Sequence, residues 1–232
     1  MQPKTILFTN EVSAQALAFA AQLELNVLVQ PMIATKLRLH EKNAILSEVK
    51  NDTAEAWIFT SKNAVQYFLL LKDLLPNYTS KQFYAVGNKT AEPLINEHIS
   101  VHIPAKEYAA DLAEMIASHS IKSALFWCGN LRREVLPDYL KAQNIFLKEL
   151  VVYDTIPQPK KITAHYDAIA FLSSSAAESF FSANTVSATI PLFAIGETTL
   201  QNLKKYTSGN IIIPEKPEVN LLLQQIQKYF SA

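Results

Sequence analysis

The sequence predicts an α/β protein built on two five-stranded parallel sheets. Three observations carry this prediction. About ten short apolar runs alternate with helical segments, which is the pattern of strands joined by crossover helices. Many of the turns that lead from a strand into a helix contain serine, threonine or glycine. The same order of sequence landmarks also occurs twice along the chain.

The N-terminal half shows the alternation first. Short apolar runs indicate strands, and apolar residues spaced three or four apart indicate helices. The expected strands are 6–9, 27–29, 57–60, 83–86 and 101–104. The first expected helix is 13–25, which Asn26 ends, and the second is 37–51, with Leu39, Ile45 and Val49 inward. A third is capped by Ser61 and carries Val65, Phe68 and Leu69, and a fourth begins at 87–90. The fifth is 108–119, with Leu112, Met115 and Ile116 inward.

The C-terminal half continues in the same way. Its expected strands are 124–127, 145–153, 169–172, 192–195 and 211–213. A helix carrying Val135, Leu136 and Leu140 follows the first of them, other helices lie between the later strands, and the last helix is 219–230. The segment 155–161 contains two prolines and is the best candidate for a linker.

Composition excludes several classes of protein. The 232 residues include 21 basic and 21 acidic side chains, so we expect no nucleic-acid partner. No apolar run has the length of a membrane span, and the first residues lack the pattern of a signal peptide. The single cysteine, Cys128, excludes an internal disulfide. These features predict a cytoplasmic protein without a membrane partner.

The repeat divides the chain into alternating parts. Residues 59–61, 83–87 and 103–106 are matched, in order and at nearly equal intervals, by 171–173, 192–196 and 213–216, and Lys4–Phe8 resembles Lys122–Phe126. The chain therefore consists of a two-strand part, a three-strand part, and a second copy of each. The residues alone leave open which two-strand part pairs with which three-strand part.

The strand-to-helix turns are the candidate binding sites, because ligands of parallel sheets bind at the carboxyl ends of the strands. Three of the four glycines, Gly87, Gly129 and Gly196, fall in such turns, where they permit close approach of a ligand or a turn with positive φ. Helix N-termini there favour anions. Ordinary helix capping explains about half of the hydroxyls in these turns, which are Thr9, Ser61, Thr90, Ser173, Ser174, Ser175, Thr198 and Thr199.

Other chemical signals are weak or absent. Lys62, Lys89, Arg132 and Arg133 lie beside the turns, and at least two of them are best explained as solvated surface charge. The sequence has neither a G-x-x-x-x-G-K-[ST] phosphate loop nor a G-x-G-x-x-G fingerprint. The histidines form no metal-ligand pattern, and Cys128 is better explained as a packed thiol than as a nucleophile. Tyr153 ends an apolar strand, either as a packed aromatic or with its hydroxyl at a cleft.

Four segments resemble the uroporphyrinogen-III synthase family over nearly the whole chain. They are Phe59-Thr60-Ser61-Lys62-Asn63-Ala64-Val65, Ala85-Val86-Gly87-Asn88-Lys89-Thr90-Ala91, Val152-Tyr153-Asp154-Thr155 and Ala194-Ile195-Gly196-Glu197-Thr198-Thr199. Their order and spacing make the resemblance more specific than any single segment. Two positions depart from the family: Thr9-Asn10 stands where Thr-Arg is common, and Phe171-Leu172-Ser173-Ser174 where Phe-Thr-Ser-Pro is common.

The resemblance implies two flavodoxin-like lobes, each with a five-stranded parallel sheet flanked by helices. Residues 1–34 and 157–232 would form a discontinuous first lobe, 37–153 the second, and 34–37 and 153–157 the connecting strands. It implies a cofactor-free conversion of hydroxymethylbilane to uroporphyrinogen III, with loss of water and inversion of ring D through a spiro intermediate.

The resemblance also implies roles for residues in the cleft. Tyr153 would be the proton donor, and Ser61, Thr90, Ser173 and Thr198 or Thr199 would line the cleft. With their neighbours, the full expected substrate-binding set is Thr9, Asn10, Ser61, Lys62, Asn63, Gly87, Asn88, Lys89, Thr90, Gly129, Asn130, Ser173, Ser174, Gly196, Thr198 and Thr199.

The expected partner is hydroxymethylbilane, with hydroxymethylbilane synthase as the candidate enzyme that hands it over, and the expected state is a hinged monomer. The substrate's carboxylates suit helix N-termini with little net positive charge. The alternative is a non-catalytic, two-lobed cytoplasmic receptor for a small anion, because repeated α/β lobes also form such binders.

Overall fold

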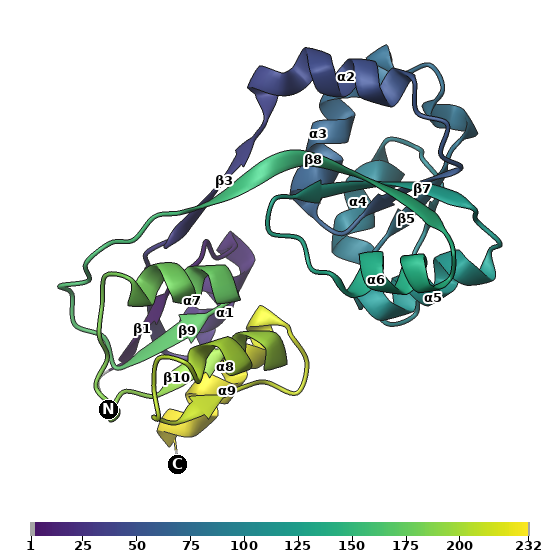
Figure 1. The fold of residues 1–232 in the computed structure, drawn as a ribbon. Coiled ribbons are helices and arrows are strands. Elements are labelled where there is room, and N and C mark those ends of the chain that lie inside the picture. Colours follow the sequence, from purple (N-terminus) through teal and green to yellow (C-terminus); the bar gives the residue numbers. More distant parts are fainter. Residues whose placement is uncertain (1–2, 232) are drawn as a thin grey trace. The chain divides into compact units, whose positions relative to one another are not determined.

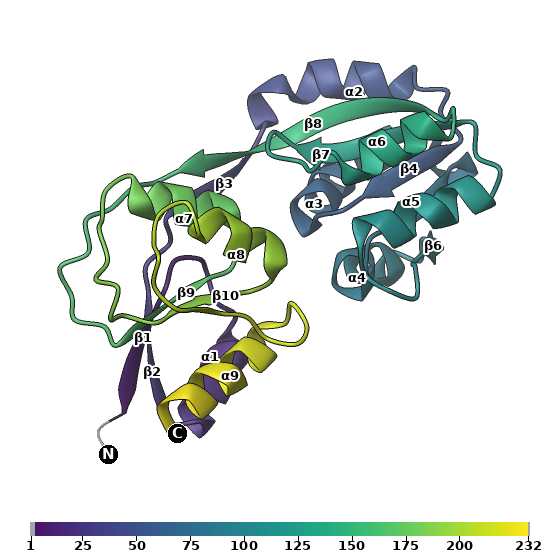
Figure 2. The same ribbon diagram turned by 60° about the horizontal axis from the view of Figure 1, so that its bottom comes forward.

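The computed structural model describes residues 3–231, which form two units, each with its own sheet and helices on both faces (Figures 1 and 2). The first unit joins the two ends of the chain, up to Ala34 and from Ile156 onward, and the second is Thr35–Thr155. Both are mixed α/β structures, as the sequence predicts.

The first unit contains one five-stranded sheet in the order β11-β10-β9-β1-β2, in which all neighbours run parallel. Its elements are β1 (Lys4–Phe8), α1 (Ala14–Gln22), β2 (Leu25–Val29), β9 (Ala168–Phe171), α7 (Ser174–Phe181), β10 (Leu192–Ala194), α8 (Glu197–Leu203), β11 (Ile211–Ile212) and α9 (Val219–Ser231).

The second sheet has the order β3-β8-β7-β4-β5-β6. Its elements are β3 (Ile33–Leu37), η1 (Leu39–Glu41), α2 (Lys42–Lys50), β4 (Ala56–Phe59), α3 (Lys62–Leu71), η2 (Lys72–Leu74), η3 (Tyr78–Ser80), β5 (Gln82–Ala85), α4 (Asn88–Asn96), β6 (Val101–His102), α5 (Ala109–Ser118), β7 (Ser123–Gly129), α6 (Val135–Ala142) and β8 (Phe146–Pro157).

The two sheets repeat one spatial pattern with the chain order exchanged. In each, a two-strand part (β2-β1 or β8-β7) continues into a three-strand part (β9-β10-β11 or β4-β5-β6). The N-terminal two-strand part pairs with the C-terminal three-strand part, which settles the pairing that the residues left open. The duplication therefore produces two alike sheets, of which only the second comes from a continuous segment.

Each sheet separates two hydrophobic clusters. In the first unit, α1 and α9 bury apolar residues on one face, and α7 and α8 bury theirs on the other. In the second unit, α2, α3 and α4 pack on one face, and α5 and α6 on the other. Trp57 is fully buried in the first of these two clusters and meets the Phe68 and Phe83 rings edge-on, with centroids 5.6 Å apart.

The second sheet corrects the prediction of five strands, because β3 adds a sixth. Arg38 N–H donates to Val152 O (2.9 Å) and Gln158 N–H to Met32 O (2.7 Å), so β3 runs antiparallel to β8. The predicted linker at 155–161 is also wrong in part. Residues up to Pro157 belong to β8, because pairing with β3 continues the strand past the expected end.

Helix ends also differ from the prediction. The predicted helix 37–51 is shorter, and Leu39 is not inward but 53% exposed, because β3 and η1 occupy its first residues. α1 ends at Gln22 rather than at Asn26, which lies in β2. The chain leaves α1 through Glu24, whose φ of 55° is the left-handed conformation that ends many helices.

Candidate functional site

The crevice of a doubly wound sheet lies where the chain leaves two neighbouring strands in opposite directions. In the first sheet this switch point lies between β1 and β9, and in the second between β7 and β4. The residues that follow these strands include many of those predicted to bind substrate. Each unit thus has one polar edge at its own switch point.

In the first unit, Asn10 ties the two strand ends together. Its amide nitrogen donates to Ser173 Oγ (3.2 Å), and its amide oxygen accepts the Leu172 N–H (3.1 Å). Ser173 in turn caps α7 by accepting the Ala176 N–H (3.2 Å). A neutral amide thus bridges the two strand ends.

The remaining hydroxyls of this edge differ in exposure. The Thr9 side chain is fully buried and donates to Ala170 O (3.3 Å), and Thr199 is 2% exposed, so neither reaches solvent in this structure. Ser174 is partly exposed and donates to Thr198 O (3.3 Å), and Thr198 is exposed. Gly196 precedes α8 without crowding: a Cβ there would lie 3.6 Å from Pro217 Cβ, its nearest neighbour.

In the second unit, Tyr153 and Ser61 come together. Ser61 caps α3 by accepting the Asn63 N–H (3.1 Å), so the partial positive charge of the helix N-terminus lies at its hydroxyl. Tyr153 is partly exposed. Burial raises the pKa of the Tyr153 phenol, and a hydrogen bond with the Ser61 side chain acts in the opposite direction. The phenol therefore keeps its proton at neutral pH.

No glycine among residues 3–231 adopts a positive φ in the left-handed region, and two of the three turn glycines, Gly87 and Gly129, instead permit close approach of a side chain. A Cβ on Gly129 would lie 2.4 Å from ring atoms of Tyr153. A Cβ on Gly87 would lie 2.5 Å from the carboxyl group of Glu107. Two of the predicted sites are thus already covered by a side chain of the same unit.

Glu107 binds the N-terminus of α4 and was not predicted from the sequence. One oxygen, Oε1, accepts both the backbone N–H and the side-chain amide of Asn88, each at 2.8 Å. Thr90 in the same turn is 7% exposed. No local motif indicates Glu107, because it lies in the loop before α5, 19 residues from Asn88.

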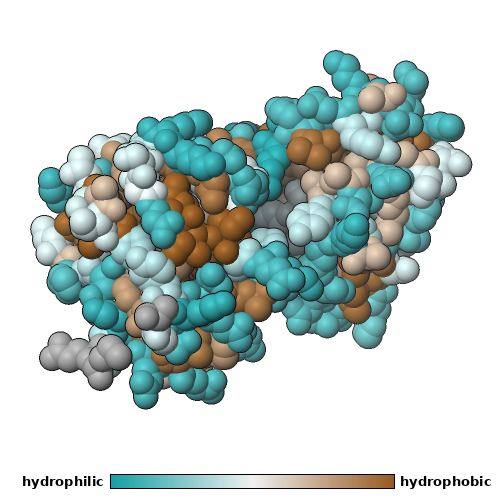
Figure 3. Space-filling model, turned by 90° about the horizontal axis from the view of Figure 1, so that it is seen from below, coloured by the Kyte–Doolittle hydropathy of each residue, from teal (hydrophilic) through white to brown (hydrophobic). Residues whose placement is uncertain are grey.

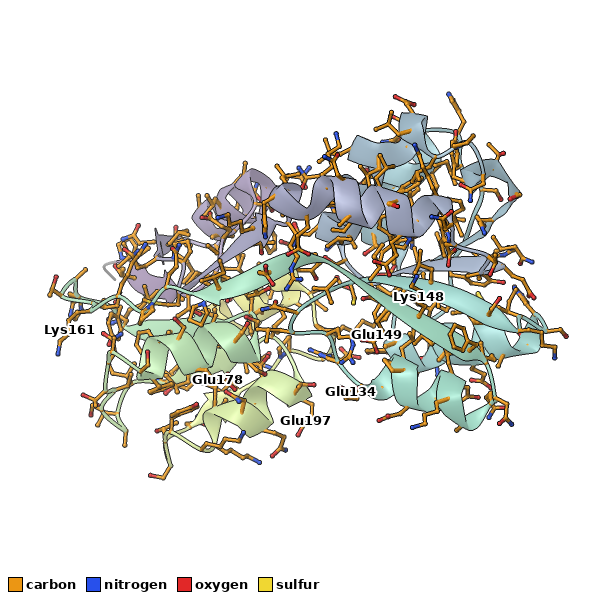
Figure 4. The ribbon with its side chains drawn as sticks, turned by 45° about the horizontal axis from the view of Figure 1, so that its top comes forward. Glu134, Lys148, Glu149, Lys161, Glu178 and Glu197 are labelled. Carbon is orange, nitrogen blue, oxygen red and sulfur yellow. The ribbon has the colours of Figure 1, made fainter. Side chains whose placement is uncertain are left out.

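The cations beside the turns differ in their partners and exposure. Arg132 is neutralised by Glu149 and by Glu134 (2.6 Å), which Figure 4 labels on β8 and in the loop before α6. Lys62 and Lys89 are exposed. A bidentate pair that the sequence did not indicate joins Arg38 to Asp154 (2.8 and 3.0 Å), one residue after Tyr153.

Other reactive groups lie outside these edges or are inert. Cys128 is buried, and burial raises the pKa of its thiol to about 12, in agreement with a packed thiol. Among residues 3–231, histidine, cysteine and acidic side chains form no group of three or more that could hold a metal. Within the same range, no helix has the length and apolar character needed to cross a membrane.

The surface is mixed in character. On the face seen in Figure 3, the first unit, on the left, carries a hydrophobic area bordered by hydrophilic side chains, and the second unit shows smaller areas of both kinds.

The fold and these edges define a class: a duplicated α/β protein that presents hydroxyl, amide and phenol groups at helix N-termini. Comparison with known proteins narrows the class. A family model described as uroporphyrinogen-III synthase HemD matches residues 14–224. The chain therefore belongs to the uroporphyrinogen-III synthase family.

Solved structures share the fold. A uroporphyrinogen III synthase mutant from Thermus thermophilus matches with a TM-score of 0.68 and 16% identity, covering 98% of this chain and 99% of that chain. The uroporphyrinogen-III synthetase from Helicobacter pylori matches with a TM-score of 0.68 and 21% identity, covering 97% and 99%. A second crystal form of the T. thermophilus enzyme matches with a TM-score of 0.54.

Family membership gives the reaction. The chain is an enzyme of tetrapyrrole and haem biosynthesis that closes hydroxymethylbilane to uroporphyrinogen III, with inversion of ring D and loss of water. This finding decides against the alternative of a non-catalytic receptor.

Proposed function

We propose that Tyr153 donates the proton that lets the substrate hydroxyl leave as water, and that the polar edges of both units bind the substrate's carboxylates. The observation that carries the first part is the place of Tyr153. Its ring lies against Gly129, the last residue of β7, and its phenol is near enough to Ser61, which follows β4, for the Ser61 side chain to affect its pKa. Burial keeps the phenol protonated at neutral pH, as a general acid requires.

The reaction then proceeds without a cofactor. Tyr153 gives its proton to the hydroxymethyl oxygen, the carbon–oxygen bond breaks, and water leaves. The positive charge on the substrate is delocalised into the pyrrole, and carbon attack from ring D gives the spiro intermediate, which opens and recloses with the ring inverted. The proton released at closure returns to the Tyr153 phenolate, so one water is lost and the enzyme is regenerated.

The binding of carboxylates rests on the helix N-termini. The substrate carries eight carboxylates, and α3, α4 and α7 begin at the carboxyl edges of their sheets. The Glu107 contact supports this proposal, because a carboxylate already binds the first turn of α4 in the structure. In this proposal, exposed groups such as Lys62, Lys89 and Thr198 contact substrate, and the buried Thr9, Thr90 and Thr199 shape their turns.

Isomer analysis of Tyr153→Phe tests the proton donor. Hydroxymethylbilane is generated in situ, purified protein is added, and the oxidised porphyrins are separated into isomers I and III. Without catalysis the bilane closes to isomer I. We expect the wild type to give mainly isomer III and Tyr153→Phe to lose about 100-fold in kcat. A folded Tyr153→Phe protein with wild-type kcat would refute the donor role.

The proposal extends to the state and setting of the enzyme. Two flavodoxin-like lobes are supported by the strand order of the first sheet, which in chain order reads 2-1-3-4-5. A cytoplasmic monomer fits an enzyme whose polycarboxylate substrate is dissolved in water. Direct supply by hydroxymethylbilane synthase fits a substrate that otherwise closes to isomer I. Light scattering during size-exclusion chromatography, with and without that synthase, tests the state and the contact.

A further inference from the structure

We propose that Gly129 and Asn130 form a seat that fixes the position of the Tyr153 phenol, and that Asn130 is a positioning residue rather than a substrate ligand. The inference rests on the proposed role of Tyr153 in proton donation. It assigns to the Asn130 side chain a function different from the one that the sequence suggested.

A bulge turns Tyr153 toward the face where Ser61 lies. The register of β7 and β8 shifts between Cys128, which pairs with Val151, and Gly129, which pairs with Tyr153. Side chains of a regular strand alternate between faces. Here Val152 and Tyr153 both pack against the cluster that contains α3, whereas Val151 packs against the opposite cluster. Without the bulge, Tyr153 would face away from α3.

Asn130 holds the backbone on both sides of this turn. Its N–H donates to Tyr153 O (3.1 Å), and its side-chain oxygen accepts the Thr155 N–H (2.8 Å). Its side-chain nitrogen lies 3.5 Å from Thr155 O, at the limit of a hydrogen bond. The Asn130 side chain thus takes the place of a further β7 residue as the hydrogen-bond partner of β8. Its shortest hydrogen bond, to Thr155 N–H, is made within the protein.

Gly129 supplies the space for the ring. A Cβ at this position would lie 2.4 Å from Cε2 and Cζ of Tyr153 and 2.9 Å from its hydroxyl oxygen. These atoms belong to a ring held by a strand, so any side chain at position 129 must displace the phenol. Displacement would change the burial that raises the pKa of Tyr153 and the influence of the Ser61 side chain that lowers it.

The test uses the full chain labelled with tyrosine carrying ¹³C at Cζ. The chain has nine tyrosines, and the Tyr153 resonance is the one that disappears in Tyr153→Phe. Its pH titration is compared in the wild type, Asn130→Ala, Asn130→Asp, Gly129→Ala and Asn184→Ala. Asn184 is the matched control, because its side chain also accepts a backbone N–H (Ile162, 2.8 Å) and donates to a backbone carbonyl (Lys160, 2.8 Å), but in the first unit.

We expect Asn130→Ala and Gly129→Ala to shift the Tyr153 resonance and to lower kcat about 10- to 100-fold, with KM changing less. Asn130→Asp keeps the acceptor for Thr155 N–H, so it should keep the wild-type Tyr153 resonance and most of the wild-type kcat. Asn184→Ala should lower thermal stability and leave the resonance in place. If Asn130→Ala does not fold, Gly129→Ala still decides whether the seat fixes the phenol.

The inference is overturned if folded Asn130→Ala and Gly129→Ala proteins keep the wild-type Tyr153 resonance, its titration and kcat. Its failure is distinct from failure of the proposed donor role. Wild-type kcat in Tyr153→Phe would remove the donor role, and the resonance of Tyr153 in the seat variants would still show whether Gly129 and Asn130 fix the ring.

Discussion

Removing Glu107 should weaken the fold slightly and improve substrate binding. In the structure its carboxylate accepts two hydrogen bonds from Asn88 at the N-terminus of α4, where the proposal places a substrate carboxylate. Substrate and Glu107 would then compete for the same donors. Removal of Glu107 therefore distinguishes two cases. If the N-terminus of α4 is a substrate site, the variant binds substrate more tightly; if Glu107 is only a structural cap, the variant only loses stability.

The magnitudes follow from the contacts. Loss of an external cap on α4 costs about 1 kcal/mol, which corresponds to a fall in Tm of about 2–4 °C for a chain of this size. If a substrate carboxylate must first displace Glu107, Glu107→Ala removes a competition of similar size and lowers KM about fivefold. Glu107→Gln keeps an acceptor oxygen without the charge, so both of its effects should be smaller.

The assay measures KM and kcat by isomer III formation and Tm by thermal unfolding. Glu114→Ala is the matched control, because it removes one exposed glutamate of the same unit, on α5, and changes the net charge equally. An unchanged KM in Glu107→Ala together with a lower Tm would refute the reasoning. The N-terminus of α4 would then be the structural site of Glu107 alone.

Further outcomes are expected elsewhere. The pH dependence of kcat should stay flat through neutrality and fall only at alkaline pH, because burial raises the pKa of the Tyr153 phenol, and a fall near pH 8 would contradict this. Burial lowers the pKa of His102 in the folded state, so the unfolded chain binds the proton more tightly, and Tm should decrease as pH drops below about 6.5. Exchanging His102 for glutamine should reduce that decrease in Tm. Trp57→Phe should destabilise the protein by about 1–2 kcal/mol more than Trp127→Phe in chemical unfolding, because the Trp57 indole donates to Asp52 (3.0 Å) whereas the buried Trp127 indole has no partner among residues 3–231.

The sequence predicts the fold well where the local pattern and the tertiary contacts agree. Apolar runs such as Trp57-Ile58-Phe59 are buried on both faces, so their strands can be recognised without knowing their neighbours. The prediction is wrong where pairing with a strand distant in the sequence determines the local structure. β3 pairs with β8 from a distant part of the chain, and that pairing shortens the predicted helix 37–51 and extends a strand through the predicted linker.

The candidate site shows the same division. Ser61 and Ser173 cap helices at the expected turns, because capping depends on residues two or three positions away. Glu107 and the seat of Tyr153 depend on residues 19 to 25 positions apart, and no short motif contains them. The glycines were recognised by their position in the turns, but the structural need for glycine differs from the predicted one. Gly87 and Gly129 provide space for side chains of the protein itself.

The two copies of the duplicated pattern differ at one asparagine each. An asparagine follows the first strand of each two-strand part, Asn10 after β1 and Asn130 after β7, and each accepts a backbone N–H from a neighbouring strand end. Asn10 reaches Leu172, at the end of β9, and closes the switch point of the first sheet. Asn130 reaches instead along β8, beyond the bulge, and leaves Tyr153 facing Ser61. The same residue type thus binds opposite neighbours in the two sheets. We infer that proton transfer belongs to the second unit and that the first unit contributes to binding.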